Sequence, residues 1–307
     1  MMWQSFDDNL GDRLIGLAKK STESATLIAP FITRGAFDEI IGQLQTSVKL
    51  KVITRWNVVD IAAGVSDPRI WESSRNRPDT KVFLSPSLHA KYFRFDSEIL
   101  VGSANITGQA LGLRSRSNIE LLTTLHDIGA GLSFESQLVK QSVEVDDDLY
   151  EATLRLVPES TTFPLHQSPA FTTNTVAESW LPQLRHPEAL WDTYTGTSES
   201  LTRTTISHAS EDLAMWDIPQ NLDKQEFHAQ ISVNLLHMPM IVSIDRLLKD
   251  PQRFGSVRDH IASEFRSLGV NREADECWQT TIRWLRYFLP DRYTYSVANY
   301  SEIMVRN

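Results

Sequence analysis

The chain has 307 residues and a formal net charge of −9, with 41% hydrophobic and 22% charged residues. This length allows two domains, and the composition excludes extensive disorder. The single cysteine, Cys277, excludes an internal disulfide, and no Cys/His cluster has zinc spacing, so we expect no metal or other cofactor. No apolar run approaches the roughly eighteen residues of a membrane span, and the start is unlike a signal peptide, so we expect a cytoplasmic protein.

The first 150 residues alternate between helical and strand-like patterns. Apolar spacing predicts helices up to about Lys20, over residues 36–44, near 58–63, from about Thr107 and over 130–145. Short β-rich runs predict strands at residues 25–32, 48–54, 81–84, 89–95, 99–101 and 118–125. This alternation is typical of an α/β fold.

The composition changes after residue 150. Residues 157–175 are rich in Thr, Ser and Pro, as linkers are, so we expect domains over 1–150 and 176–307 joined by a linker over 151–175. Within the second domain, residues 226–236 predict a strand and residues 293–305 alternate like strands. Two amphipathic patterns predict helices at Val257–Phe265 and Arg272–Phe288, so this smaller domain is expected to be α+β.

The stretch from residue 87 to 107 carries the strongest chemical signal. On a strand, His89 and Lys91 project to the same side because they are two residues apart. The next predicted strand ends in Gly102-Ser103-Ala104-Asn105, where small residues let the backbone approach a ligand closely. The Lys91 ammonium, the Ser103 hydroxyl, the Asn105 amide and the positive end of the helix expected from Thr107 would suit a phosphate.

This pattern resembles a known motif. His89, Lys91 and Asp96, followed by Gly102, Ser103 and Asn105, resemble the HKD motif of the phospholipase D superfamily, and Asn118-Ile119-Glu120 resembles the Asn-x-Glu that follows it in the family's nucleases. Five residues separate Asp96 from Gly102, where six are commoner. The resemblance covers residues 24–145 and implies a phospholipase D-like α/β/α sandwich with a mixed central sheet.

The resemblance also implies a mechanism. His89 would attack phosphorus to give a phosphohistidine, and a second histidine would protonate the leaving oxygen, with no metal required. Members with a single motif complete the site by forming a homodimer, and this chain has one motif. Lys91 and Asn105 would hold the phosphate oxygens, and Glu120 would accept a hydrogen bond from His89 Nδ1.

The remaining motif residues receive lesser roles. Ser103 is a candidate hydrogen-bond donor to the phosphate, while Asp96 and Gly102 are expected to be structural. Arg114 and Arg116 lie between the motif and Glu120 and could contact phosphates, or could be plain surface charges. The acidic run over residues 144–151 reads as a solvated face, or as a segment that competes with a polyanion for the site.

The resemblance favours nucleic acid over lipid, because lipid-acting members tend to have two motifs or a membrane anchor, and this sequence shows neither a membrane span nor a basic amphipathic helix. The motif is most similar to those of nucleases of bacterial restriction and phage-defence systems. We therefore expect a homodimeric nuclease that acts on DNA, with residues 176–307 serving recognition, dimerisation or docking. A second hypothesis is a nucleic-acid-binding or assembly subunit of a defence complex, because residues 1–125 hold 15 Lys/Arg against 13 Asp/Glu. A third is a lipid or small-molecule phosphodiesterase.

Overall fold

The computed structural model describes residues 9–114, 117–157, 178–197, 201–216, 218–298 and 301–307. The chain folds as two compact units, residues 1–165 and 166–307. Helix α6 (Asp147–Leu156) belongs to the first unit, so the first residues of the expected linker are helical. Residues 158–177, which hold most of that linker, lie outside the described residues. Within the described ranges every helix is too short or too polar to span a lipid bilayer.

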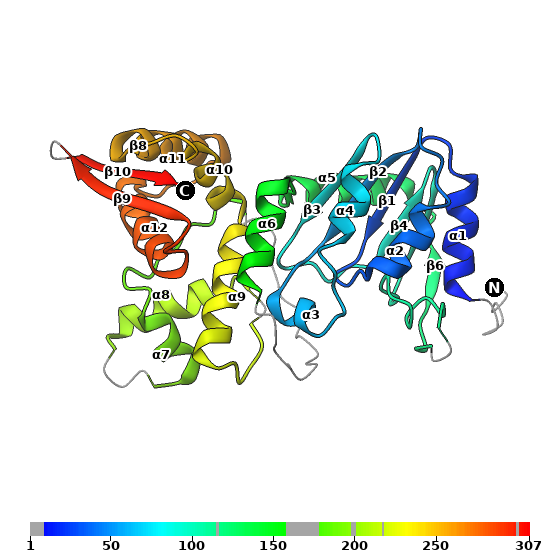
Figure 1. Cartoon of the computed structure of the whole chain (residues 1–307), viewed down its shortest axis with the longest axis horizontal. Coiled ribbons are helices and arrows are strands. Elements are labelled where there is room, and N and C mark those ends of the chain that lie inside the picture. Colours follow the sequence, from blue (N-terminus) through cyan, green and yellow to red (C-terminus); the bar gives the residue numbers. More distant parts are fainter. Residues whose placement is uncertain (1–8, 115–116, 158–177, 198–200, 217, 299–300) are drawn as a thin grey trace. The chain divides into compact units, whose positions relative to one another are not determined.

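The N-terminal unit is built on a seven-stranded mixed sheet with the order β6-β5-β4-β1-β2-β3-β7 (Figure 1). Strands β1, β2 and β3 run parallel, and the other strands pair antiparallel with their neighbours. The strands are β1 (Ser24–Ile28), β2 (Lys49–Thr54), β3 (Thr80–Leu84), β4 (Tyr92–Phe95), β5 (Glu98–Gly102), β6 (Leu122–Thr124) and β7 (Val143–Glu144).

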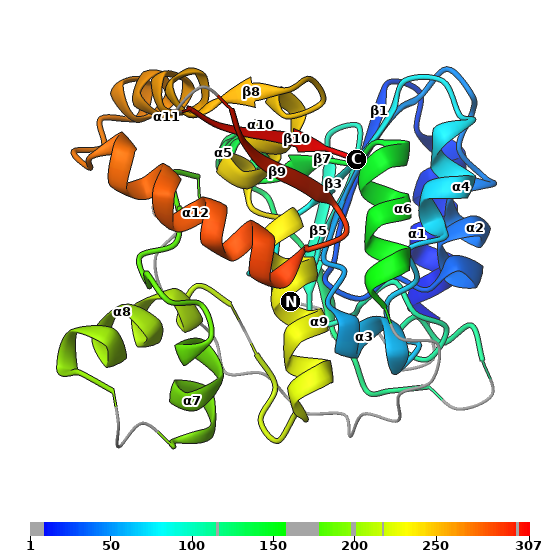
Figure 2. The ribbon, with the colours of Figure 1, turned by 60° about the vertical axis from the view of Figure 1, so that its left-hand side comes forward.

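Helices cover both faces of this sheet. Helix α2 contacts α1 and α4, and α4 packs on β3, whereas α5 packs on β5 from the opposite side (Figure 2). The helices are α1 (Leu10–Lys20), α2 (Arg34–Ile41), α3 (Val58–Ala62), α4 (Ile70–Arg75), α5 (Ile128–Lys140) and α6. The expected α/β fold with a mixed central sheet between helices is therefore confirmed.

The central strands are apolar on both faces because both faces are covered. Leu27 and Ile28 in β1 and Val52 and Ile53 in β2 are fully buried, as parallel strands between helices require. The sequence order that predicts α/β alternation is thus the order in which these strands and their covering helices follow one another.

The acidic run before α6 is engaged by neighbouring side chains of the same unit. Glu144 pairs with Lys81 at 3.1 Å. Asp147 accepts hydrogen bonds from Trp71 Nε1 at 2.8 Å and from Arg75 at 3.1 Å. These contacts lie at the surface, as a solvated acidic face requires.

The C-terminal unit combines helices with a small antiparallel sheet of order β8-β10-β9. Its core holds Trp180, Trp216 and Trp284, with ring centroids of Trp180 at 4.9 Å from Trp216 and 6.1 Å from Trp284. The elements are α7 (Ala189–Thr195), α8 (Arg203–Leu213), α9 (Lys224–Leu236), α10 (Pro239–Leu247), β8 (Gln252–Arg253), α11 (Phe254–Leu268), α12 (Ala274–Phe288), β9 (Tyr293–Ala298) and β10 (Ser301–Arg306). A smaller C-terminal region of mixed helices and strands is confirmed.

The strand predicted at residues 226–236 is wrong, because these residues belong to helix α9. Residues 230–236 are all buried, so the polar face that would reveal a 3.6-residue period is missing. Asp223 and Glu226 form a capping box at its start, which is the sequence signal that indicates a helix here.

A buried ionic cluster joins α10 to the ends of the C-terminal sheet. The two oxygens of Asp245 accept hydrogen bonds from Arg292 at 2.8 Å each, from Arg306 at 2.7 Å and from the Tyr293 hydroxyl at 2.7 Å. Although burial favours the neutral acid, the bonds from Arg292 and its charge hold the pKa of Asp245 below its usual range. One carboxylate therefore pairs with two arginines inside this unit.

Replacing Asp245 with asparagine is expected to lower the free energy of unfolding by about 3–5 kcal/mol, because two largely buried guanidinium groups lose their counter-charge. The matched control is Asp259→Asn, which removes an exposed partner of Arg258 and should cost less than about 1 kcal/mol. Denaturant unfolding of the full chain measures both. Equal, small effects would contradict the importance of the cluster.

Candidate active site

The sheet topology gathers the predicted site residues at one edge. The carboxyl ends of β1, β2 and β5 lie there, and so do the starting ends of β4 and β6, because Ile28 pairs with Tyr92 and Gly102 with Leu122. His89 and Lys91 precede β4, Ser103 and Asn105 follow β5, and Glu120 precedes β6. Segments far apart in sequence thus reach one edge of the sheet, which is the usual place for a site in such folds.

His89 and Lys91 lie in a segment without regular secondary structure just before β4, so the strand predicted over residues 89–95 begins only at Tyr92. Their side chains nevertheless meet. Lys91 Nζ donates to the His89 carbonyl oxygen at 2.8 Å and lies 3.4 Å from His89 Nδ1. His89 is exposed and Lys91 is half-buried, so the imidazole can be reached from solvent.

The contact between Lys91 and His89 bears on the tautomer of the imidazole. An ammonium group can only donate, so a charged Lys91 facing Nδ1 requires Nδ1 to accept and places the ring proton on Nε2. An imidazole that attacks through Nε2 needs the opposite tautomer, with its proton on Nδ1. Lys91 must therefore move, or lose its proton, before His89 Nε2 has a lone pair to use.

Ser103 and Glu120 are joined directly. The Ser103 hydroxyl donates to Glu120 Oε2 at 2.5 Å, and Asn118 Nδ2 donates to Oε1 at 3.2 Å. The backbones approach closely here, since a Cβ on Gly102 would come within 1.8 Å of the Leu121 carbonyl oxygen. Only glycine fits at this position, and its absence of a side chain lets the segment that carries Glu120, just before β6, lie beside Ser103.

Asn105 is oriented by the loop that follows β1. The Phe31 N–H donates to Asn105 Oδ1 at 3.4 Å, and the surrounding backbones pair, with Thr33 N–H donating to the Ile106 carbonyl at 2.9 Å. Because the amide oxygen faces Phe31, the amide nitrogen of Asn105 remains as the donor for a ligand. Residues 29–33 therefore orient the Asn105 side chain, which is one of the proposed donors to a phosphate.

The charges around Lys91 include a residue that the sequence analysis missed as a site residue. Partial burial lowers the pKa of Lys91, the neighbouring Arg55 cation lowers it further, and Glu120 opposes the shift. Arg55 directly follows β2 and its side chain is 4% exposed. The sequence signal that could have identified Arg55 is its place directly after a buried parallel strand, at the carboxyl edge of the sheet where the motif residues lie.

Asp96 lies at the opposite end of β4, in the two-residue turn to β5, with φ of +50°. Its carboxylate accepts hydrogen bonds from the backbone N–H groups of Thr22, Glu23 and Ser24 and from the Ser21 hydroxyl, at 2.8–3.0 Å. Partial burial opposes ionisation, but the backbone bonds prevail and hold the pKa of Asp96 at about 2. Asp96 thus fastens the entry to β1 and does not contact the other motif residues in the described contacts.

The helix expected from Thr107 is wrong, because residues 108–112 form turns. Its positive N-terminus is consequently absent from the donors proposed for a phosphate. Gly112 has φ of +70°, which a regular helix does not tolerate. Arg114 is exposed, and its side chain lies against Gly108, three residues after Asn105. Arg116 lies outside the described residues.

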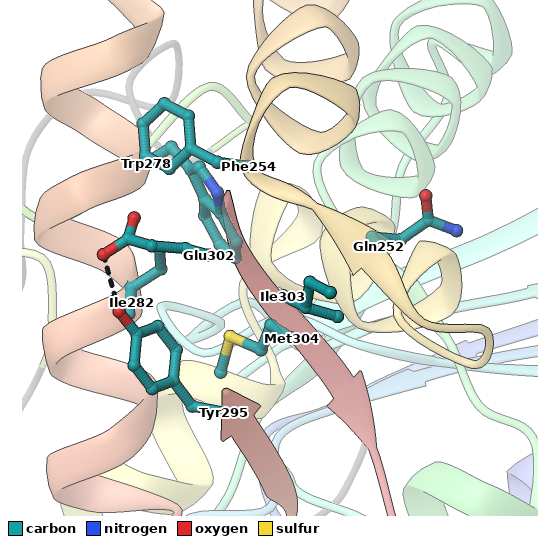
Figure 3. Close-up of a pocket in the computed structure, with 8 residues that line it drawn as sticks. All are labelled: Gln252, Phe254, Trp278, Ile282, Tyr295, Glu302, Ile303 and Met304. Carbon is teal, nitrogen blue, oxygen red and sulfur yellow. Dashed lines mark hydrogen bonds between the residues drawn. The ribbon is translucent and has the colours of Figure 1, made fainter. Parts of the chain in front are cut away.

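A separate small pocket lies in the C-terminal unit, between α11, α12 and the strands β9 and β10 (Figure 3). It is lined in part by Trp278, Tyr295 and Glu302. The Tyr295 hydroxyl donates to Glu302 at 2.6 Å, so this carboxylate is engaged within the unit. The pocket contains none of the predicted site residues.

Comparisons with known proteins give partial likenesses only. No family model and no curated protein matches the chain. Among solved structures, NucT from Helicobacter pylori is 19% identical with a TM-score of 0.35, over 44% of this chain and 89% of NucT. Nuc from Salmonella typhimurium, a phospholipase D family member, is 11% identical with a TM-score of 0.32, over 44% and 90%. Phosphatidylserine synthase from Haemophilus influenzae is 16% identical with a TM-score of 0.35, over 41% and 33%.

Replacing Asp96 with asparagine is expected to lower the free energy of unfolding by about 1–3 kcal/mol at neutral pH, because charged acceptors of backbone bonds are lost. The wild-type advantage should be full above pH 3.8 and disappear as the pH falls towards 2, since the folded pKa lies below the unfolded one.

Asp79→Asn is the matched control, because Asp79 also has a positive φ, +48°, but is exposed. Asparagine tolerates this backbone conformation, so the control should change stability by less than about 0.5 kcal/mol. Unfolding curves recorded between pH 2 and 7 measure both variants. A difference between wild type and Asp96→Asn that stays constant down to pH 2 would contradict the assignment.

Proposed function

We propose that this chain is a phospholipase D-like phosphodiesterase that cleaves nucleic acid, with DNA as the preferred substrate. The reaction requires no metal and takes place in a site shared by the two chains of a homodimer. The observation that carries the proposal is the meeting of His89 and Lys91 with Ser103, Asn105 and Glu120 at one edge of the sheet. The similarities to solved structures are low, so the argument rests on the chain's own residues.

The donors at this edge fit a phosphodiester. Lys91 supplies an ammonium, and Asn105 supplies an amide nitrogen because its oxygen faces Phe31. Ser103, two residues before Asn105, donates its hydroxyl to Glu120 and would have to turn to donate to a phosphate. Charged and oriented donors of this kind stabilise the negative charge that grows on phosphate oxygens in a displacement. Arg114, which is exposed a few residues further on, is a candidate contact to a neighbouring phosphate.

The chemistry takes two steps. In the first, His89 Nε2 attacks phosphorus, the bond from phosphorus to the leaving oxygen breaks, and a protonated imidazole gives that oxygen its proton. In the second step, the imidazole that acted as the acid is neutral and takes a proton from water. The water oxygen attacks phosphorus, and the bond between phosphorus and His89 Nε2 breaks. Glu120 holds the proton of His89 Nδ1 once Lys91 has turned to the phosphate.

The second imidazole comes from a second copy of the chain. With one motif per chain, a two-fold axis beside the site would bring two His89 rings to one phosphorus, one as nucleophile and one as acid. Ile119 and Leu121, which flank Glu120, are 91% and 66% exposed. Two large apolar side chains left in water beside a polar site are consistent with a surface that a second copy covers.

A second candidate function is nucleic-acid binding without cleavage, within a defence complex. The specific observation in its favour is charge: the chain carries −9 in total, and its first 125 residues hold 15 basic against 13 acidic residues. A nuclease that acts alone on duplex DNA usually offers a more basic surface. A partner that supplies the cationic surface would reconcile either function with this charge.

The first test uses labelled single-stranded DNA, duplex DNA, RNA and phospholipid in EDTA. Wild-type protein should cleave a nucleic acid, and His89→Ala should reduce the rate by at least about 10³-fold, because the nucleophile and the acid are lost together. His126→Ala, an exposed histidine of the same unit, is the control and should retain the wild-type rate. Binding without cleavage favours the nucleic-acid-binding function. Cleavage of phospholipid favours a lipid phosphodiesterase, and inhibition by EDTA contradicts the metal-free mechanism.

The second test concerns the homodimer. Leu121→Asp is expected to raise the dimer dissociation constant at least tenfold and to lower activity at dilute protein, because a buried leucine contributes about 1.5–3 kcal/mol. Leu154→Asp on α6, also an exposed leucine of this unit, is the control and should dissociate like wild type. Sedimentation velocity across a concentration series measures both. A monomeric wild type that cleaves DNA would exclude the shared site.

A further inference from the structure

The further inference concerns Arg55, whose side chain is buried at the edge of the sheet that carries the motif. Its Nε donates to Asp60 at 2.9 Å, its Nη1 reaches the Leu88 carbonyl at 3.5 Å, and its Cζ lies 5.1 Å from the centre of the Phe31 ring. A cation over an aromatic face and beside a carboxylate is held in one orientation.

Two of these contacts lead directly to the motif. Leu88 is the residue before His89, so its carbonyl group belongs to the peptide that carries the nucleophile. Phe31 donates its N–H to Asn105, so the ring under Arg55 belongs to the residue that orients the phosphate-binding amide. The guanidinium group of Arg55 therefore contacts both the residue before His89 and the residue that orients Asn105.

We propose that Arg55 is a positioning residue of this site, which fixes the His89 peptide relative to Asn105 and sets the charge environment of Lys91. The inference rests on the phosphodiesterase proposed above and goes beyond its motif. Lysine cannot replace arginine in this role, because three contacts in different directions need the planar fork of the guanidinium group.

Besides positioning the His89 peptide, Arg55 changes the pKa of Lys91 through its charge. The charged or titratable groups that face Lys91 are Arg55, Glu120 and His89, and Arg55 lowers the pKa of Lys91 while Glu120 raises it. A lower pKa means that Lys91 loses its proton at a lower pH. If Lys91 must be protonated to hold the phosphate, activity falls on the basic side as the pH passes this pKa.

A buried arginine can also be purely structural, and the chain offers a matched case. Arg94 on β4 is 8% exposed and forms hydrogen bonds to Glu135 on the face covered by α5. Its described contact to a motif residue is to the carbonyl oxygen of the structural Asp96 at 2.9 Å, at the opposite end of β4 from His89. Arg94 lies in the sheet and Arg55 directly follows one of its strands, and each pairs with a carboxylate. Substitutions at the two positions should therefore cost stability alike but differ in their effect on catalysis.

The test compares full-length Arg55→Gln and Arg55→Lys with Arg94→Lys, using kcat on the preferred DNA substrate, its pH profile and the fraction of folded protein. Arg55→Gln should lower kcat per folded molecule about 10- to 100-fold and move the basic limb to higher pH, because a cation beside Lys91 is lost. Arg55→Lys should lower kcat but leave the limb in place. Arg94→Lys should change neither.

The pKa of Lys91, followed by side-chain NMR in the wild type and in Arg55→Gln, separates this inference from the proposed function. A rise of the Lys91 pKa supports the placement of Arg55 even if the wild type cleaves nothing, which would defeat only the proposed function. An unchanged Lys91 pKa, or a kcat and pH profile of Arg55→Gln like those of Arg94→Lys, overturns the inference. If Arg55→Gln does not fold, the positioning role is tested with Arg55→Lys, which keeps the charge: a kcat per folded molecule equal to that of the wild type overturns the inference.

Discussion

The site depends on one constraint, the antiparallel pairing of β4 with β1. This register sets Tyr92 opposite Ile28 and Phe95 opposite Ala25, so His89 and Lys91 lie at the carboxyl edge of the parallel strands while Asp96 lies at the other edge. A slip by one residue would turn every side chain of β4 to the other face. The carboxylate of Asp96 opposes such a slip, because it binds the backbone that leads into β1.

A buried ionic cluster fixes the same pair of strands from the face covered by α5. Glu135 accepts hydrogen bonds from Arg94 and Tyr92 on β4 and from Thr26 on β1, and Thr26 lies directly opposite Arg94. Burying two charges costs several kcal/mol, which is offset only when every lone pair finds a partner. Here two donors reach each carboxylate oxygen, so any other register would leave charge buried without partners.

The sequence predicts the alternating elements and the motif, because both depend on local spacing. It predicts less well where tertiary contacts decide. His89 precedes β4 instead of lying within it, and residues after Thr107 form turns because Gly112 takes a left-handed conformation. Burial on all sides hides the helical period of α9. Arg55 could not be found from spacing, because its link to the motif runs through residues 24 and 33 positions away.

In the proposed mechanism, the position of Lys91 connects substrate binding with activation of His89 as the nucleophile. Its ammonium group donates to the His89 carbonyl and faces Nδ1, a contact that suits a ring protonated on Nε2. A phosphate oxygen offers an ammonium a stronger, charge-assisted bond than a carbonyl does. Turning Lys91 to a phosphate would leave Nδ1 able to donate to a carboxylate and Nε2 with a lone pair. The same side-chain movement would thus bind the substrate and prepare His89, which explains why a lysine two residues from the histidine suits this chemistry.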